Sequence, residues 1–250
     1  MTFDKDETPK APLIVAHGLF GAARNWRAHA KRMGPGRRVV AVDMRNHGDS
    51  PWDDANSYHD MAADLADTIE ATGAPAAVLG HSMGGKASMV LALTRPDLVE
   101  RLIVADIAPA AYDHTLMGEV EAMRAIDLTG LTRRSEVEAA LEASVPDKPT
   151  RSFLAHSAVL GENPRWSLNL DALGANMDLI TGFPNVTGEY AGPTLFLTGG
   201  ASKYVRQEHR ETVVRLFPNA RHEAIRDAGH WLHADKPREF VDAVNRFLES

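Results

Sequence analysis

The sequence predicts an α/β domain in which a mostly parallel sheet is flanked by helices and carries a helical insertion. Short apolar runs alternate with amphipathic helical patterns over residues 12–111, and this alternation returns over residues 190–248. Because the runs are almost continuously apolar, the strands are expected to be buried on both faces, as in parallel sheets covered by helices. Between these stretches, helical patterns follow one another without strands. We therefore expect a core formed by residues 1–111 and 190–250, with residues 112–189 inserted as a helical cap.

Composition limits the classes of function that the chain can have. Hydrophobic residues make up 44% of the 250 residues and charged residues 24%, as in globular proteins with a full core. The formal net charge of -7, without a basic stripe, argues against nucleic acid as a partner, since phosphate contacts need clustered Lys and Arg. The absence of cysteine excludes a disulfide scaffold, a thiol nucleophile and a thiolate metal site.

No targeting or membrane signal is visible in the sequence. The N-terminal residues are acidic and polar rather than apolar or arginine-rich, and no window approaches the ~18 continuous apolar residues of a membrane span. We expect a cytoplasmic protein, a monomer or small homo-oligomer, whose partner is a small molecule and not a membrane.

Apolar runs and helical periodicity locate the elements. Strands are predicted at residues 13–16, 38–42, 76–79, 102–105, 194–197 and, more weakly, 222–225. Helices are predicted at residues 57–72, 86–93, 207–217 and 237–248, and within the insertion at 117–127, 135–143, 151–160 and 170–180. The helix at 57–72 has the clearest boundaries, because Ser57 and Asp60 have capping-box spacing and Gly73 ends it.

The stretch Gly80-His81-Ser82-Met83-Gly84 fits the pattern Gly-x-Ser-x-Gly and lies between a predicted strand and a predicted helix. A serine on such a tight turn has a strained backbone that exposes its hydroxyl, and the glycines avoid collisions with the neighbouring strand and helix. Ser82 is therefore predicted to be a nucleophile. An ordinary serine in a glycine-rich turn is the alternative for the bare pattern, and the strand and helix on either side argue against it.

A serine hydroxyl needs an adjacent base, and His230 is the predicted base. It follows Gly229 in the loop after the last predicted strand, and it would complete the chain order Ser, Asp, His of this turn's fold. His233 and His222 are the alternatives, because both are close in sequence.

The acid that would orient the imidazole is less clearly marked. The loop after the strand at 194–197 is its commonest place, yet residues 199–203 contain no Asp or Glu. Asp106, at the end of the strand that follows the nucleophile helix, is the predicted acid. Asp178, Asp171 and Glu208 remain alternatives, while Asp227 is expected to cap a turn.

The oxyanion hole and the acyl pocket are expected beside Ser82. Two backbone N–H groups should stabilise the oxyanion, one from Met83 and one from the loop after the first strand, from Leu19 or Phe20. Phe20 and Trp231, with apolar residues of the cap, are expected to line a hydrophobic pocket.

Five polar residues near these motifs are expected to have structural roles. His17 should brace the loop after the first strand by hydrogen bonding, and Arg45 and His47 should hold adjacent loops together. His81 is expected to pack with its side chain turned away from the nucleophile. Lys86 could contact a substrate carboxylate, but its helix position favours a packing or surface role.

Linked motifs extend along nearly the whole chain: HGLFG at residues 17–21, DMRNHG at 43–48, GHSMGGK at 80–86, DIAP at 106–109 and GHWLHA at 229–234. Together they resemble the α/β-hydrolase subfamily of bacterial YbfF-type esterases and ABHD11-like relatives. The resemblance implies hydrolysis of carboxylic esters, with acyl thioesters as a further substrate class, by an enzyme without metal or organic cofactor. It supports Ser82 and His230 directly, and Asp106 matches a position of the family.

These observations predict a serine carboxylesterase that hydrolyses small acyl esters through an acyl-enzyme. An acyl-CoA thioesterase would use the same triad and is the nearest alternative. A non-catalytic ligand receptor on a hydrolase scaffold is a third hypothesis, although a receptor has no need of an intact Ser, Asp and His. Dehalogenases and epoxide hydrolases need an aspartate nucleophile, which is absent at Ser82; carbon–carbon hydrolases and perhydrolases share the triad.

Overall fold

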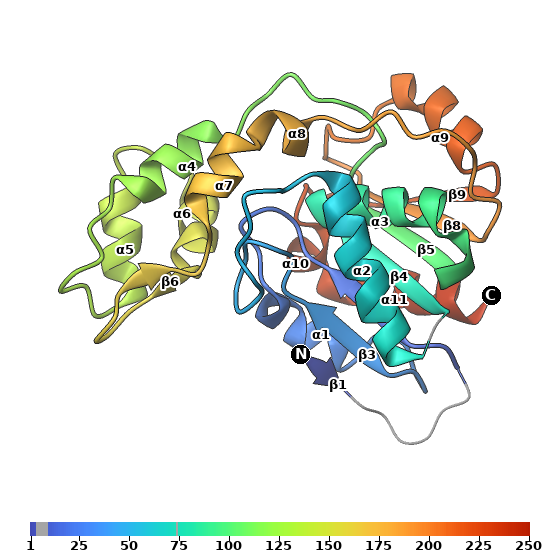
Figure 1. Ribbon diagram of the computed structural model, residues 1–250, viewed down its shortest axis with the longest axis horizontal. Helices are drawn as coiled ribbons and strands as arrows, with labels where there is room; N and C mark the ends of the chain where they lie inside the picture. The colour runs from blue at the N-terminus through green and yellow to red at the C-terminus, as the bar shows by residue number, and fades with distance from the viewer. Residues whose placement is uncertain (4–9, 74) are drawn as a thin grey trace.

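The computed structural model describes residues 1–3, 10–73 and 75–250, and within these ranges its centre is a seven-stranded sheet with the order β1-β3-β2-β4-β5-β8-β9 (Figure 1). The strands are β1 (Thr2–Phe3), β2 (Leu13–Ala16), β3 (Val39–Val42), β4 (Ala76–His81), β5 (Val99–Ala105), β8 (Thr194–Gly199) and β9 (Ala220–Ile225). β1 pairs antiparallel with β3, and the other neighbouring pairs are parallel. The predicted α/β class with a mostly parallel sheet is confirmed.

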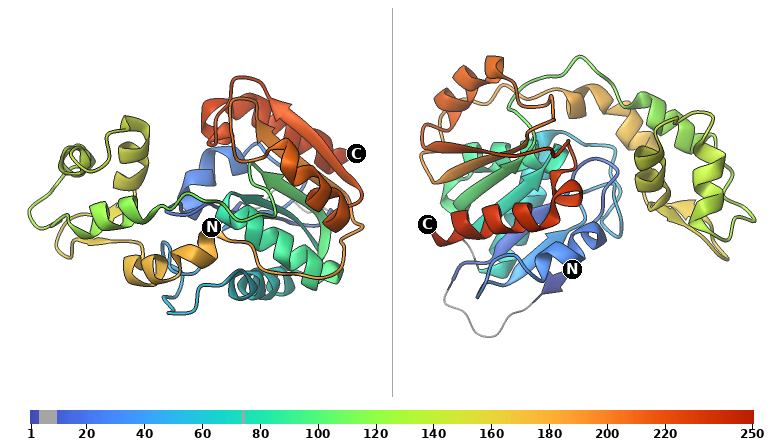
Figure 2. Two further views of the ribbon diagram at one scale, coloured as in Figure 1. Left: turned by 90° about the horizontal axis from the view of Figure 1, so that it is seen from above. Right: turned by 180° about the vertical axis from the view of Figure 1, so that it is seen from behind.

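Helices cover both faces of this sheet (Figure 2). One face packs against α2 (Tyr58–Thr72), α3 (Met83–Thr94) and α9 (Arg210–Leu216), and the other against α1 (Arg27–Ala30), α10 (Leu232–Asp235) and α11 (Pro237–Glu249). Successive strand residues alternate between the faces, so that Ile14 packs in one core cluster while Leu13 and Val15 pack in the other. Both faces of the central strands are buried, which explains their continuous apolar runs.

The helix α2 begins and ends as its sequence predicts. The Ser57 hydroxyl accepts the backbone N–H of Asp60 at 3.2 Å, and Asp60 Oδ2 accepts the backbone N–H of Ser57 at 2.9 Å. These two bonds satisfy donors that a helix start leaves without intrahelical partners. Gly73 ends the helix in the left-handed region with φ 89°.

The greater part of residues 112–189 forms a lobe beside the sheet, on the left in Figure 1. It contains α4 (Met117–Arg124), α5 (Arg134–Leu141), α6 (Lys148–Ala155), α7 (Leu170–Ala175), α8 (Met177–Thr181) and an antiparallel hairpin of β6 (Ala158–Val159) and β7 (Arg165–Trp166). The hairpin corrects the expectation of helices without strands. Gly161 lies in the turn of this hairpin with φ 115°, a backbone conformation that residues with a side chain rarely adopt.

Two helix predictions in this lobe were wrong at their boundaries. The helix expected at 151–160 begins at Lys148, because Asp147 caps it by accepting the backbone N–H of Thr150 at 2.9 Å. Pro149 therefore lies in the first turn, where its missing N–H costs nothing, rather than between helices. The helix expected at 170–180 is divided at Asn176, whose backbone leaves the helical region.

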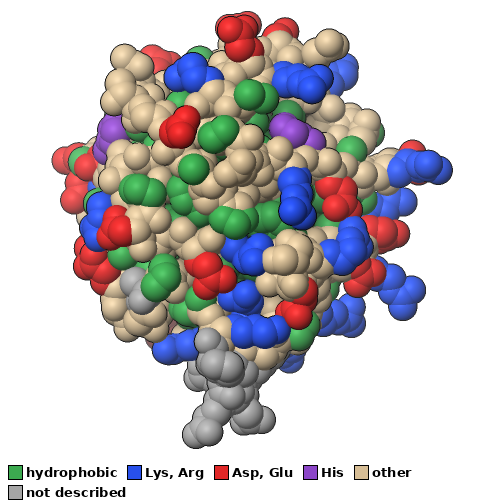
Figure 3. Space-filling model, turned by 90° about the vertical axis from the view of Figure 1, so that its right-hand side faces the viewer, with side chains coloured by type: hydrophobic (Ala, Val, Ile, Leu, Met, Phe, Trp, Pro, Cys, Tyr) green, Lys and Arg blue, Asp and Glu red, His purple; other side chains and the backbone are tan. Residues whose placement is uncertain are grey.

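Other differences are smaller. The two-residue strand β1 was not predicted, and the segment expected as one helix at 207–217 begins with a 3-10 turn, Gln207–His209. Among the described residues, no helix is both long and apolar enough to cross a membrane. Acidic and basic side chains are interspersed on the face opposite the lobe (Figure 3).

Candidate active site

Ser82 lies at the sharp bend between β4 and α3, with φ 51° and ψ -118°. A residue with a side chain rarely adopts a positive φ, and the neighbouring contacts hold Ser82 in it. A Cβ atom on Gly80 would lie 2.2 Å from the carbonyl oxygen of Gly84, and one on Gly84 would lie 2.5 Å from that of Ala16. Both positions therefore require glycine, as the Gly-x-Ser-x-Gly pattern predicts.

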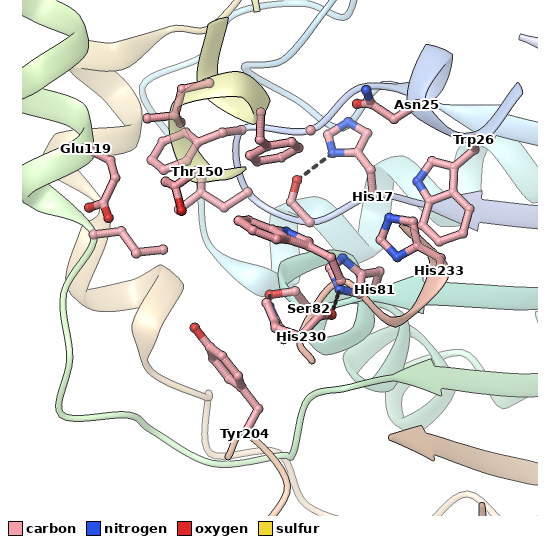
Figure 4. Close-up of a pocket in the computed structure, with 18 residues that line it drawn as sticks. His17, Asn25, Trp26, His81, Ser82, Glu119, Thr150, Tyr204, His230 and His233 are labelled. Atoms are coloured by element: carbon pink, nitrogen blue, oxygen red, sulfur yellow. Dashed lines mark hydrogen bonds between the residues drawn. The ribbon is translucent and has the colours of Figure 1, made fainter. Parts of the chain in front are cut away.

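His230 lies in the loop between β9 and α10 and faces Ser82 (Figure 4). Its Nε2 is 3.1 Å from Ser82 Oγ, and its Nδ1 is 2.8 Å from Asp106 Oδ2. Because the carboxylate can only accept, the imidazole donates from Nδ1 and leaves Nε2 free to accept the serine proton. The structure thus brings together the three residues that the sequence nominated as a triad.

The alternative bases and acids make other contacts, although His233 lines the same cavity as Ser82. His233 stacks on Trp26 with ring centroids 4.5 Å apart, and His222 stacks on Phe196 at 5.3 Å. Among the alternative acids, Asp171 pairs with Arg124, Glu208 pairs with Arg206, and Asp178 belongs to α8. Asp227, which was expected to cap a turn, has a left-handed backbone in a turn.

Asp106 is completely buried directly after β5, and its carboxylate accepts three hydrogen bonds. Oδ1 accepts the backbone N–H of Gly199 at 2.9 Å, while Oδ2 accepts the Ser202 hydroxyl at 2.5 Å as well as the His230 N–H. A buried carboxylate is costly without such donors. The loop after β8 therefore contains no acid, but the last residue of β8 and this loop each supply one of the donors that hold the acid following β5.

Of the backbone N–H groups near Ser82, one already donates to a side chain, and others can still donate to an oxyanion. Phe20 donates its N–H to His47 Nε2 at 3.1 Å, so this donor already has a partner. Met83 is the first residue of α3, and the N–H groups of a first helical turn have no partner within their own helix. The geometry therefore favours Leu19 over Phe20 as the second donor beside Met83.

Two buried histidines brace the loops on which these donors lie. His17 donates from Nδ1 to the Gly18 carbonyl and accepts the N–H of Met44 at Nε2, while His47 donates from Nδ1 to the Arg45 carbonyl. Burial lowers the pKa of His17 to about 4 and that of His47 to about 3, against the opposing effect of these backbone hydrogen bonds. Both are neutral near pH 7, as accepting an N–H requires.

Arg45 and His81 also have the structural contacts expected of them. Arg45 binds both carboxylate oxygens of Asp64, at 2.6 and 2.8 Å, and so ties the loop after β3 to α2. His81 is buried behind the nucleophile, and its Nε2–H donates to the backbone carbonyl of His230 at 2.9 Å.

The prediction for Lys86 needs a correction. A packing or surface role was expected, and the structure shows that the side chain is not at the surface. It is almost completely buried on α3, and its ammonium donates to the carbonyl oxygens at the end of α8, Thr181 at 2.8 Å and Gly182 at 2.5 Å. The rings of Tyr58 and Tyr112 flank it at 5.6 and 4.7 Å. Burial lowers the pKa of Lys86 to about 7.

Two contacts of the His230 imidazole have no signal in the sequence. Tyr204 stacks on the His230 ring with centroids 3.9 Å apart and 20° between planes, and its N–H donates to the Ser202 hydroxyl at 3.3 Å. The opposite side of His230 faces His81 at 4.8 Å. In the sequence, the loop after β8 is distinguished only by its lack of an acid. No local pattern indicates that Tyr204 in this loop stacks on the ring of His230.

Ser82 and His230 border a cavity of about 260 Å³ between the sheet and the lobe (Figure 4). Phe20 and Trp231 line it, as do Leu116, Phe153 and Leu154 from the lobe. The rings of Trp231 and Phe153 lie 5.4 Å apart and so join the two sides of the cavity. Within the described part of the chain, no group of three or more His, Asp and Glu side chains is arranged to hold a metal ion.

The model of the alpha/beta hydrolase fold family matches residues 11–237. The chain belongs to the α/β-hydrolase family. Mouse sn-1-specific diacylglycerol lipase ABHD11 is 43% identical over 98% of this chain and 83% of its own length. Esterase YbfF of Escherichia coli strain K12 is 35% identical over 95% of this chain and 93% of its own. The expected resemblance to these two groups of α/β-hydrolases is confirmed.

A solved structure described as a marine microorganism esterase has a TM-score of 0.92 and 35% identity, covering 99% of this chain and 98% of its own. This similarity extends over both the sheet and the lobe of the present α/β-hydrolase. With the curated relatives, it identifies the chain as a serine hydrolase that acts on carboxylic esters.

Proposed function

We propose that this α/β-hydrolase is a serine carboxylesterase that hydrolyses small acyl esters through an acyl-enzyme, with Ser82, His230 and Asp106 as its triad. The observation that carries the proposal is the continuous hydrogen-bonded series from Ser82 Oγ to His230 at 3.1 Å and from His230 to the buried Asp106 at 2.8 Å. This series opens on a mostly apolar cavity of about 260 Å³, which suits a small acyl group.

In the acylation step, Ser82 Oγ attacks the ester carbonyl while His230 Nε2 accepts its proton. The resulting imidazolium is stabilised by Asp106, and the tetrahedral oxyanion accepts the N–H groups of Leu19 and Met83. The imidazolium then protonates the leaving alkoxide, the carbon–oxygen bond breaks, and the alcohol departs.

Deacylation repeats these steps with water as the nucleophile. His230 Nε2 accepts a proton from water, the hydroxide adds to the acyl carbonyl, and collapse of the second tetrahedral intermediate returns the proton to Ser82 Oγ. Residues 112–189 act as the cap in this proposal, because Leu116, Phe153 and Leu154 close the acyl side of the cavity and limit the water that reaches it.

The first experiment compares wild type with Ser82→Ala on a series of p-nitrophenyl esters of increasing acyl length. Loss of the nucleophile should lower kcat by several orders of magnitude, because no group remains to form the acyl-enzyme. A fluorophosphonate probe should label the wild type and leave Ser82→Ala unlabelled. Ester turnover retained by Ser82→Ala would refute the assignment, and a wild type that the probe does not label would favour the receptor hypothesis.

Substrate class requires a second comparison. An acyl-CoA thioesterase would use the same residues, so kcat/KM should be measured for an ester and an acyl-CoA of equal chain length. We expect the ester to be the better substrate, and a large preference for the thioester would replace the proposed activity by the alternative one.

A further inference from the structure

The lining of the cavity has an unusual charge composition. Eighteen residues line it, and Figure 4 shows Glu119 on the lobe side, across the cavity from Ser82 and His230. Among the described residues that line it, Glu119 is the one carboxylate, and there is no Lys or Arg. The remaining polar groups are uncharged or are histidines. A substrate that fills the cavity therefore meets a single formal charge, and that charge is negative.

The charge of Glu119 is not neutralised by a neighbour in the described part of the chain. Glu119 is half-buried in the first turn of α4 and forms no ion pair there, whereas Glu121 on the same helix pairs with Arg124 at 2.7 Å. The negative charge of Glu119 also acts on Tyr204, a neighbour of His230. Burial and the charge of Asp106 raise the pKa of Tyr204, and Glu119 adds to this increase. Tyr204 in turn stacks on His230.

We propose that Glu119 is a specificity-determining residue, which makes the enzyme select uncharged and cationic esters and reject esters that carry a carboxylate or phosphate. This inference rests on the proposed function, because it concerns the substrates of the same site. It places hemiesters of dicarboxylic acids and other anionic acyl donors among the poor substrates. It also gives a physical reason for the ester to be preferred over acyl-CoA, whose phosphates would approach the same carboxylate.

The size of the effect follows from Coulomb's law. Two unit charges about 10 Å apart at an effective dielectric constant of about 20 to 40 change a binding equilibrium by roughly 4-fold to 17-fold. Since Glu119 is only half-buried, we expect the lower part of this range. Removing its charge should therefore improve kcat/KM for an anionic ester by about 4-fold to 10-fold relative to a neutral one.

The test compares matched esters on wild type, Glu119→Gln and Glu121→Gln. On the acyl side the pair is p-nitrophenyl pentanoate and mono-p-nitrophenyl glutarate, which have the same chain length and differ by one carboxylate. On the alcohol side the pair is the pentanoyl esters of hydroxybenzamide and hydroxybenzoate. Glu121→Gln is the matched control, because it removes the same charge from the same helix at a side chain that does not line the cavity.

We expect Glu119→Gln to raise the anionic-to-neutral ratio of kcat/KM by about 4-fold to 10-fold in at least one pair, while Glu121→Gln leaves both ratios unchanged. Glu119→Lys should raise the same ratio further and lower kcat/KM for a trimethylammonium-capped butanoate ester. Thermal unfolding of each variant checks that the fold persists.

Two outcomes would overturn the inference, and they are distinguishable. If wild type turns over the neutral esters in a Ser82-dependent way but neither ratio responds to Glu119→Gln or Glu119→Lys, Glu119 only stabilises the start of α4, and the proposed function stands. If wild type shows no Ser82-dependent turnover of the neutral esters, the proposed function fails and the inference fails with it.

Discussion

The carboxylate of Asp106 depends on donors from the end of β8 and from the loop after it, which contains no acid. Gly199 N–H and the Ser202 hydroxyl bind it at 2.9 and 2.5 Å, and His230 is the third donor at 2.8 Å. The Gly199 and Ser202 donors fix the orientation of the carboxylate, which in turn fixes the tautomer of His230. Asp106 contacts His230 directly, whereas Ser202 acts on His230 only through Asp106. Substituting Asp106 and substituting Ser202 should therefore have different effects.

Asp106→Asn should lower kcat by roughly 10³-fold to 10⁴-fold, because an amide nitrogen facing His230 Nδ1 favours the tautomer with the proton on Nε2, which cannot accept from Ser82. KM for a small ester should change little, since Asp106 does not line the cavity. Steady-state kinetics on p-nitrophenyl pentanoate, together with thermal unfolding, measures both effects. Retention of most of the wild-type kcat would show that another group is the acid.

Ser202→Ala should lower kcat by about tenfold, since one charge-assisted hydrogen bond of the Asp106 carboxylate is lost while Gly199 still binds it. Ser202→Thr keeps the hydroxyl and should restore most of the rate, which a loss of packing alone would not explain. Equal activity of Ser202→Ala and wild type would show that the backbone donor is sufficient.

At the scale of elements, Lys86 joins the helix that follows the nucleophile to the end of the lobe. Its ammonium donates to the carbonyl groups at the C-terminus of α8, where a helix leaves its last carbonyls without intrahelical partners. A cation is also favourable at that end of the helix dipole. The contact therefore positions α8 against α3.

Lys86→Met keeps the length and removes the ammonium, so it should release this contact while the apolar stem remains packed. We expect an increase in KM for esters larger than the change in kcat, because the lobe that closes the cavity is less well placed, and a loss of about 1 to 3 kcal/mol in the free energy of unfolding. Lys31→Met, at an exposed lysine, is the control. An unchanged KM would mean that the contact stabilises the fold without shaping the cavity.

Elements with strong local signals could be predicted from the sequence, and those fixed by weaker local signals could not. The buried strands and α2 are encoded by continuous apolar runs, a capping box and a terminal glycine. The hairpin of β6 and β7 has strands of only two residues, too short to show a period. The division between α7 and α8 falls at Asn176, two residues after Gly174, and a single glycine inside a helical pattern does not by itself end the predicted helix.

The same distinction applies to the site. Ser82 was predictable because its turn needs glycines at fixed positions, and His230 because it follows Gly229 after the last strand. Ser202, Tyr204 and Glu119 reach the site through loops and helices whose approach depends on tertiary packing. No sequence pattern around these three residues indicates that approach, so their contacts could be identified only from the structure.

At the scale of the whole molecule, neutral buried histidines link the loops at the carboxyl edge of the sheet. Burial lowers the pKa of His17 to about 4 and those of His47 and His233 to about 3. The charge of His17 adds to this effect for His47, and the charges of His29 and His230 add to it for His233. Each ring is therefore neutral in the folded protein at pH values where it is protonated in the unfolded chain.

The sign of the pH dependence follows directly. Below the unfolded value of about 6.5, the unfolded chain binds protons that the folded protein does not, so the free energy of unfolding decreases as the pH falls. Each such histidine contributes a slope of about 1 kcal/mol per pH unit. The loss begins near pH 6.5 and continues to about 4 for His17 and to about 3 for His47 and His233.

Urea unfolding between pH 7 and pH 4 should therefore show a steep decrease in stability below about pH 6. His233→Phe supplies the decisive comparison, because phenylalanine keeps an aromatic ring against Trp26 and removes the titrating imidazole. The Nδ1 atom of His233 has no hydrogen-bond partner in the described part of the chain, so the substitution breaks no hydrogen bond at that atom. The variant should lose less stability than wild type between pH 6 and pH 4. A wild type whose stability is the same at pH 7 and pH 5, or a variant whose slope equals that of wild type, would show that these imidazoles do not set the acid limit of the fold.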